Sequence, residues 1–259
     1  MVLSIVNQKG GVGKTTTAVN LAAALSLSGK SVLLIDLDAQ GNATTGLGVS
    51  KKSAEITSYD VFIGFADANN AIIHTEKCGI DLIPASIDLA GVDTELAGSQ
   101  NRTYLLDAAL EPLKNKYDYI IVDSPPSLGS LTINVLTASD GVIVPMQCEF
   151  YSMEGLVQLQ ETMKQVKSRY NKNLETVGIL FTMNPMFSKA SSAVIKEISS
   201  HFSDLVFKTV IPRTNKLNVA PSFGEPIFNF AKNSKGAKAY LSLAREVIER
   251  TQKGNETNV

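Results

Sequence analysis

A glycine-rich stretch near the start of the chain constrains the fold more than any other part of the sequence. It has the sequence Lys-Gly-Gly-Val-Gly-Lys-Thr-Thr over residues 9–16, between an apolar run (2–6) and an Ala- and Leu-rich segment (18–27). The apolar run predicts a buried strand, and the later segment predicts a helix packed on a sheet. Glycines in such a turn let successive backbone N–H groups point at one anion, and the helix adds its positive N-terminal end. The sequence therefore predicts a phosphate-binding loop.

The two lysines of this loop have different expected tasks. Lys14 is placed to reach the β- and γ-phosphates of a nucleotide, and Thr15 offers its hydroxyl to Mg²⁺. Gln8 stands where the usual pattern has its first glycine, and Lys9 adds a second amine that is free to stabilise charge elsewhere. The alternative for Lys9 is an ordinary solvated lysine. We expect ATP contacts from the whole loop, which comprises Lys9, Gly10, Gly11, Val12, Gly13, Lys14, Thr15 and Thr16.

Two further predicted strands end in aspartate. Residues 31–36 and 117–123 are largely apolar and end in Asp36 and Asp123, and Asp38 follows closely after the first of them. Ligands of parallel sheets collect beyond the carboxyl ends of the strands, so these carboxylates are expected near the phosphate loop. Asp123 is expected to order the Mg²⁺ shell or its waters, and Asp36 to act behind the metal or the loop.

The rest of the chain continues to alternate between predicted strands and helices. Residues 141–145, 176–183 and 206–211 are expected to form strands, and helices are expected at 103–116, 131–137, 153–170, 191–202 and 235–250. This order predicts an α/β fold, a single-domain P-loop NTPase with a mostly parallel twisted sheet covered by helices on both faces. We expect one ATPase domain over residues 1–252 and a disordered tail over 253–259.

Composition narrows the remaining classes of protein. The 24 Lys and Arg residues nearly balance the 25 Asp and Glu residues, but residues 186–253 hold 11 basic and 5 acidic side chains, which hints at an anionic partner. Cys78 and Cys148 show neither the spacing of a zinc site nor that of a disulfide framework. No signal peptide or membrane-spanning run is evident, so a cytoplasmic protein is expected.

The lysine-bearing loop, the Asp38 segment, the Asp123 strand and residues 212–224 together resemble the ParA/Soj partitioning ATPases, which carry the deviant Walker A box of the ParA/MinD group. The resemblance implies a slow, partner-stimulated ATPase that uses ATP and Mg²⁺. It also implies an ATP-dependent sandwich homodimer in which Lys9 touches the ATP of the other subunit. Asp38 takes the position of the acid that orients the attacking water, although a cap or turn role is the alternative. Asn184 and Pro212 take the positions that contact adenine.

The same resemblance implies non-specific DNA binding, stimulation by a ParB-like protein, and segregation of a chromosome or plasmid. The ATP-bound form would then associate with the nucleoid. Phosphate neutralisation requires only basic side chains, pooled over two subunits. The candidates are Lys189, Arg213, Lys216, Lys235, Lys238 and Arg245, and the alternative for each is an ordinary surface side chain. Lys216 stands where arginine is usual in this family.

Two other functions share the same loop chemistry. A MinD-like membrane-surface or cargo-positioning switch would need a basic amphipathic C-terminal helix. Residues 240–250 are mixed in charge and favour a helix packed on the core, so no membrane partner is expected. A metabolic P-loop enzyme, such as dethiobiotin synthetase or a relative of the nitrogenase iron protein, is the second alternative. The latter needs cluster cysteines whose pattern Cys78 and Cys148 do not match.

Overall fold

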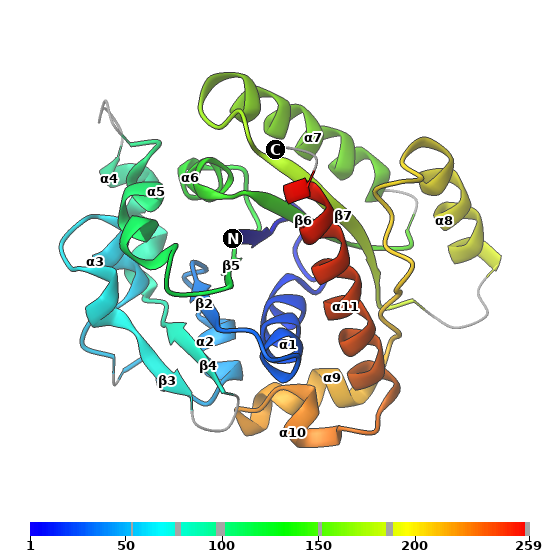
Figure 1. Ribbon diagram of the computed structural model, residues 1–259, viewed down its shortest axis with the longest axis horizontal. Helices are drawn as coiled ribbons and strands as arrows, with labels where there is room; N and C mark the ends of the chain where they lie inside the picture. Colours follow the sequence, from blue (N-terminus) through cyan, green and yellow to red (C-terminus); the bar gives the residue numbers. More distant parts are fainter. Residues whose placement is uncertain (53, 76–78, 97–101, 150–151, 185–188, 257–259) are drawn as a thin grey trace.

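A parallel sheet forms the centre of the computed structural model, which describes residues 1–256 except 53, 76–78, 97–101, 150–151 and 185–188 (Figure 1). In the described residues the sheet has seven strands in the order β3-β4-β2-β5-β1-β6-β7. The strands are β1 (Val2–Ile5), β2 (Val32–Asp36), β3 (Ile73–Thr75), β4 (Ile80–Ile83), β5 (Tyr119–Asp123), β6 (Gly141–Gln147) and β7 (Glu175–Thr182). Only the edge pair β3–β4 is antiparallel among these strands. The predicted α/β fold with a mostly parallel sheet is confirmed.

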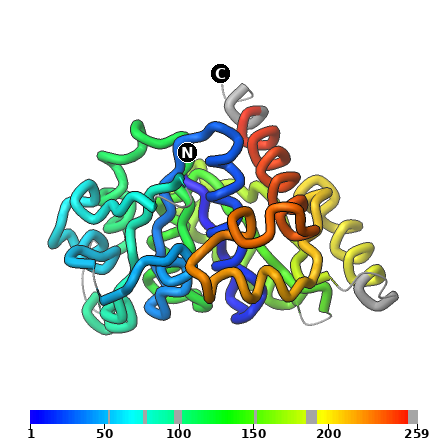
Figure 2. The backbone as a smooth tube through the Cα atoms, turned by 90° about the horizontal axis from the view of Figure 1, so that it is seen from below, coloured from blue at the N-terminus to red at the C-terminus, as the bar shows by residue number. Residues whose placement is uncertain are grey.

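Helices cover both faces of this sheet (Figure 1). The α-helices are α1 (Lys14–Leu27), α2 (Asn42–Gly46), α3 (Ser58–Phe62), α4 (Val92–Glu95), α5 (Leu105–Leu110), α6 (Ser130–Ala138), α7 (Ser152–Arg169), α8 (Lys189–His201), α9 (Asn215–Val219), α10 (Ile227–Ala231) and α11 (Lys235–Glu256). Short 3₁₀ turns are η1 (Ala68–Ala71), η2 (Ile87–Gly91), η3 (Glu111–Leu113) and η4 (Ala220–Phe223). Figure 2 shows the orange segment with α9 and α10 between the cyan part of the chain and the red α11.

Alternation of side chains along the strands divides the apolar core into two layers. Leu3 and Ile5 of β1 pack with α1 and α11, whereas Val2 and Val6 pack on the other face with α6 and α7. Strands β2 and β5 divide their side chains between the same two layers. A strand buried on both faces is therefore apolar at nearly every position, and its polar residues gather where it ends.

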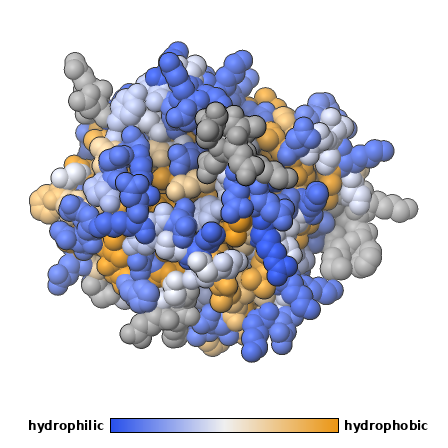
Figure 3. Space-filling model, viewed as in Figure 1, coloured by the Kyte–Doolittle hydropathy of each residue, from blue (hydrophilic) through white to orange (hydrophobic). Residues whose placement is uncertain are grey.

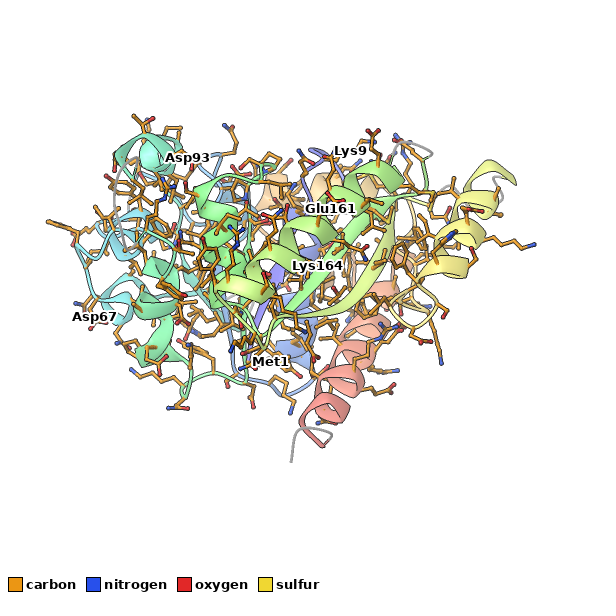
Figure 4. All side chains as sticks on the ribbon, turned by 90° about the horizontal axis from the view of Figure 1, so that it is seen from above. Met1, Lys9, Asp67, Asp93, Glu161 and Lys164 are labelled. Carbon is orange, nitrogen blue, oxygen red and sulfur yellow. The ribbon has the colours of Figure 1, made fainter. Side chains whose placement is uncertain are left out.

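The register of the central strands brings their carboxyl ends to one edge of the sheet. Ile5 of β1 and Asp36 of β2 both lie beside Asp123 of β5. The phosphate loop follows β1 directly, so it leaves the sheet at the same edge. Figure 4 shows Lys9 at the side of the molecule opposite Met1, the two ends of the path through β1.

The segment 206–211 differs from its prediction, because it forms isolated bridges rather than a strand. Val206 is bridged to Ile179 of β7, and the next bridge, Asn184 to Pro212, follows only after the segment has ended. Between these points the Glu246 carboxylate of α11 accepts the backbone N–H groups of Lys208 and Thr209 at 2.8 and 3.1 Å. A side chain thus satisfies donors that a neighbouring strand would otherwise have paired.

Two further boundaries differ from the prediction. The expected helix over residues 103–116 is shorter, with α5 giving way to η3 where Pro112 occupies the turn. At the other end of the chain we predicted disorder from Lys253, but the backbone of α11 continues to Glu256, and residues 257–259 lie outside the described part. In the part of the chain that the structure describes, none of the helices is sufficiently long and apolar to span a membrane.

Candidate nucleotide site

The phosphate loop has the backbone conformation that its glycines predict. Gly11 and Gly13 have φ values of 72° and 87°, in the left-handed region that other residues rarely adopt. Helix α1 begins at the next residue, Lys14, with its N-terminal end at the loop. The first turn of α1 contains no acidic residue, so nothing there competes with a bound anion.

Three donor side chains, one from the loop itself and two from distant strands, contact the carbonyls of this loop. The Lys14 Nζ lies 3.2 Å from the Lys9 carbonyl oxygen, and the Thr182 hydroxyl donates to the Val12 carbonyl at 2.7 Å. The Gln147 side-chain amide donates to the Gly11 carbonyl at 3.1 Å. These bonds satisfy acceptors that a cradle of inward-pointing N–H groups leaves facing away from the anion.

The ammonium group of Lys14 is placed to meet negative charge. Its side chain is buried, and burial lowers the pKa of Lys14 from its ordinary value, an effect that the carboxylates of Asp123 and Asp38 partly oppose. A buried ammonium group is stabilised by an anion within a few ångströms. A triphosphate bound in the loop would supply that charge.

Asp123 is a buried carboxylate without a hydrogen-bond partner. It has no exposed surface, and neither of its oxygens has a partner among the described residues. Burial, and then the charge of Asp36, hold the pKa of Asp123 well above its usual range, whereas the Thr15 hydroxyl lowers it. Unsatisfied carboxylate oxygens beside a hydroxyl fit Mg²⁺ or the water molecules that it binds. The residues present therefore fit the predicted metal.

Asp36 is buried beside Asp123 but is tied into its own surroundings. One oxygen accepts the Thr44 N–H at 2.8 Å and the Thr44 hydroxyl at 2.7 Å, and the other accepts the Asp38 N–H at 3.2 Å. Burial raises the pKa of Asp36 to about 6, although the bonds from Thr44 oppose the shift. Asp36 therefore connects the β2 end to α2, a position behind the loop rather than in direct contact with a ligand.

Asp38 lies on the same turn and is half-buried. Its Oδ1 accepts the Gln40 N–H at 2.9 Å, which is the turn contact that we gave as the alternative to a catalytic role. Its Oδ2 has no hydrogen-bond partner among the described residues. The carboxylate is close enough to affect Lys14 electrostatically, so the structure brings it to the loop.

The other loop lysine points away from the cradle. Lys9 Nζ lies 2.6 Å from Glu149 Oε2, and both side chains are about half exposed, at 41% and 56%. Glu149 follows β6, 140 residues later in the chain. Lys14 occupies the cradle, whereas Lys9 lies at the surface beside it.

The predicted adenine contacts come together beside the loop. Asn184 and Pro212 form an isolated parallel bridge, and the Asn184 side-chain oxygen is buried without a partner among the described residues. A pocket of about 160 Å³ lies between Gly13 and Pro212. Met183, the residue before Asn184, has φ 50°, an uncommon conformation for a residue other than glycine.

Among the candidate DNA contacts, Arg213 is one of the residues that line this pocket. The exposed members among them are Arg213, Lys216, Lys235, Lys238 and Arg245. Positions 235, 238 and 245 fall on one side of α11 at 100° per residue. A Cβ at Gly236 would lie 3.0 Å from Leu217 Cγ, so Leu217 of α9 packs against the first turn of α11. Helix α8 begins at Lys189, whose side chain lies outside the described residues.

Sequence reasoning missed three groups that shape the site, namely Gln147, Thr182 and Thr44. Gln147 and Thr182 are the last residues of β6 and β7, which end at the same edge of the sheet as the aspartate-bearing strands. The rule applied to Asp36 and Asp123 would therefore have found both. Thr44 carries no comparable signal, because it precedes no motif; its hydroxyl donates to Asp36 and accepts the Ala85 N–H at 2.9 Å.

Comparisons with known proteins agree with this geometry. A family model described as an AAA domain matches residues 1–176. The sporulation initiation inhibitor protein Soj of Bacillus subtilis is 50% identical over 246 residues, covering 95% of this chain and 97% of that protein. The chromosome partitioning protein ParA of Caulobacter vibrioides is 48% identical over 251 residues, covering 96% and 94%. A solved structure of cobyrinic acid a,c-diamide synthase from Mycobacterium smegmatis, with bound ATP analogue and magnesium, has a TM-score of 0.85 and 37% identity over 98% of this chain and 96% of that chain.

Proposed function

The chain belongs to the ParA/Soj family of partitioning ATPases, and we propose that it hydrolyses ATP with Mg²⁺ to drive the segregation of a chromosome or plasmid. In this proposal ATP brings two subunits face to face, and the dimer binds DNA without sequence preference. A ParB-like protein accelerates hydrolysis, and the dimer then separates and leaves the DNA. The protein is cytoplasmic and associates with the nucleoid while it holds ATP.

The placement of Lys9 carries this proposal. One loop lysine already fills the cradle, and the second extends to the surface, where its ion pair with Glu149 holds it in place. An exposed ion pair contributes little stability, so a stronger anion can replace Glu149 at little cost. The triphosphate of a second subunit would be such an anion, and positive charge there stabilises the transition state of phosphoryl transfer.

Each remaining site residue has a role in the same reaction. The loop N–H groups and Lys14 bind the phosphates, and Thr15 and Asp123 would hold Mg²⁺ and the water molecules that it carries. Asp36 keeps the Asp38 turn in position through its bond to the Asp38 N–H. Asp38 orients the attacking water through its second oxygen. Mg²⁺ would supply charge neutralisation between the β- and γ-phosphates.

The proposed contacts with the adenine base and with DNA lie next to the phosphate loop and on α11. The unpartnered Asn184 oxygen can accept a bond from the amino group of adenine, beside the backbone at Pro212. The basic side of α11 and the neighbouring Arg213 and Lys216 offer exposed cations to DNA phosphates. Figure 3 shows mainly hydrophilic side chains over α11.

The structure does not favour the membrane-surface alternative. The apolar side of α11, with Tyr240, Leu243 and Val247, is buried against the sheet and α1. A membrane anchor would need that side to be exposed. The metabolic alternative has some support, because the similar Mycobacterium structure is that of a synthase. This alternative predicts that ATP turnover rises when a small-molecule acceptor is added and does not change when DNA is added.

Retardation of random-sequence DNA tests the proposal. We expect retardation with ATP but neither with ADP nor without nucleotide, and weaker binding at the higher of two salt concentrations, because phosphate contacts release counterions. DNA binding that ignores the nucleotide, or turnover that answers only to a metabolite, would contradict the proposal.

A pair of double variants locates the DNA surface. Lys235→Ala with Lys238→Ala should weaken DNA binding and, because the dimer loses two lysines in each subunit, lower its salt dependence by about four counterions. The control is Lys164→Ala with Lys167→Ala, which removes two exposed cations from α7. An equal loss of DNA affinity in both double variants would refute the placement of the DNA-binding surface on α11.

A further inference from the structure

A single side-chain amide connects the phosphate loop with the turn that precedes Asn184. Gln147 is the last residue of β6, and its Nε2 lies 3.1 Å from the Gly11 carbonyl oxygen and 3.1 Å from Met183 Sδ. Gly11 lies in the loop that binds phosphate. Met183 is the residue before Asn184. The Gln147 side chain therefore contacts both halves of the nucleotide site.

The contact with Gly11 requires a hydrogen-bond donor on the Gln147 side chain. Gly11 has a left-handed backbone, and its carbonyl oxygen accepts from the Gln147 amide at 3.1 Å. Only a donor can satisfy that carbonyl, which identifies the contacting atom of Gln147 as its amide nitrogen. Thr182, at the end of β7, does the same for Val12. Side chains at the ends of two neighbouring strands thus contact carbonyls of the loop, whose shape its glycines allow.

The other contact of Gln147 reaches a turn in an uncommon conformation. Met183 has φ 50°, which a residue with a side chain keeps only where its surroundings hold it. The next residue, Asn184, is bonded through its N–H to the Ile211 carbonyl at 3.2 Å and through its carbonyl to the Arg213 N–H at 3.3 Å. A shift of Met183 therefore moves Asn184 together with the segment that carries Pro212.

We propose that Gln147 is a positioning residue that couples recognition of the base to the geometry of the phosphate loop. A base bound against Asn184 and Pro212 fixes the conformation of the Met183 turn. The Gln147 amide, which contacts Met183, is then held in place, and it holds the Gly11 carbonyl of the phosphate loop. The coupling is reciprocal, so an ordered loop also favours the turn that receives the base. This inference rests on the placement of the base in the proposed function.

Binding of two probes separates this coupling from a simple structural role. Isothermal titration measures the affinity of the protein for MgATP and for magnesium tripolyphosphate, which has the phosphates but no base. Gln147→Met keeps the length of the side chain and removes its donor. We expect the ratio of the ATP affinity to the tripolyphosphate affinity to fall by about 2- to 12-fold, the range that one hydrogen bond supplies.

A second variant and a matched control complete the design. Met183→Leu removes the sulfur acceptor but leaves the bond to Gly11, and it should lower the same ratio. Gln158→Met makes the same exchange on the exposed side of α7 and should leave both affinities unchanged. Thermal unfolding without nucleotide shows whether each variant folds like the original chain.

The possible results lead to distinct conclusions. If Gln147→Met weakens both probes by the same factor, or weakens neither, the coupling is refuted while the base site stands. If the original chain binds tripolyphosphate as tightly as ATP, the base site of the proposed function fails and the coupling fails with it. A lowered ratio in both variants, with an unchanged control, supports the coupling.

Discussion

At the scale of single residues, two buried carboxylates side by side define the electrostatics of the site. Asp36 and Asp123 lie opposite each other on β2 and β5, and both are fully buried. Their difference lies in their partners, because Thr44 satisfies Asp36 whereas Asp123 has no partner among the described residues. A cation near Asp123 would stabilise its ionised form, so metal binding and the protonation of this pair are linked.

The raised pKa of Asp36 predicts how stability depends on pH. Between its unfolded pKa of 3.8 and its folded pKa of about 6, the native state binds the proton more tightly, so this contribution to stability is lost as pH rises through 6. For a shift of this size the loss is about 3 kcal/mol. Asp36→Asn, which cannot ionise, should therefore gain most of that amount, about 2.4 kcal/mol, relative to the original chain between pH 4 and pH 7. Urea unfolding without nucleotide at both pH values measures the difference.

A carboxylate with the opposite shift serves as the control. Bonds from the backbone and side chain of Ser31 lower the pKa of Asp118, so its contribution is present at neutral pH and is lost on acidification. Asp118→Asn should then lose stability relative to the original chain as pH rises. A stability difference for Asp36→Asn that stays constant with pH would show that Asp36 is not protonated in the folded protein near pH 5.

At the scale of elements, α11 organises the side of the sheet next to β7. Arg250 donates to the carbonyls of Val177 and Val206 at 2.8 and 2.7 Å and to that of Leu205 at 3.1 Å, and its guanidinium lies 4.3 Å from the Phe207 ring centre. With Glu246, this arginine fixes the segment that we expected to be a strand. Arg250 is therefore part of the framework and does not belong to the basic surface of α11.

Arg250→Lys should destabilise the fold although the charge is kept. Lysine lacks the planar fork that reaches several carbonyls, so the part-buried carbonyls of Val177 and Val206 lose this charged donor, at a cost of about 1.5–3 kcal/mol. Arg245→Lys, on the exposed side of the same helix, should change the free energy of unfolding by less than about 0.5 kcal/mol. Urea unfolding compares the two. Similar small effects at both positions would mean that the carbonyls find other donors.

At the scale of the whole molecule, the site is built where five segments meet at one edge of the sheet. The β1–α1 loop supplies the cradle, β2 and β5 supply carboxylates, and β6 and β7 supply the side chains that hold the loop. The parallel arrangement makes this possible, because it brings all these strand ends to the same side. Lys9 lies at that edge, which is the face that a second subunit would approach (Figure 4).

Gly10→Val tests the approach of two such faces. A Cβ at Gly10 meets no atom within 4 Å, so the larger side chain has room in one subunit. Two facing loops in close contact would not have that room. We expect unchanged thermal unfolding without nucleotide and loss of the ATP-dependent dimer in size-exclusion chromatography with light scattering. Gly10→Ala should show a smaller effect, and a Val variant that still dimerises with MgATP would refute the close contact.

Much of the site follows from the sequence, because its elements are local or obey a general rule of parallel sheets. The spacing of glycines determines the cradle, the apolar runs mark strands, and Asp36 and Asp123 follow because strand ends meet at one edge. The second lysine, Lys9, could likewise be recognised from the sequence of the loop alone. These features depend on backbone conformation within a few residues and on the direction of the strands.

Only the tertiary structure decided which distant groups contact the loop. Gln147 is 136 residues from Gly11, and Thr182 is 170 residues from Val12. The rule for strand ends places both residues at the edge where the loop lies, but their contacts require β1, β6 and β7 to be neighbours in a particular register, which no local pattern specifies. The same holds for Glu246 and Arg250, which satisfy the backbone of residues 205–209 and so replace the strand that its apolar sequence predicts. Local chemistry thus determined the parts of the site, and the packing of distant elements determined their contacts.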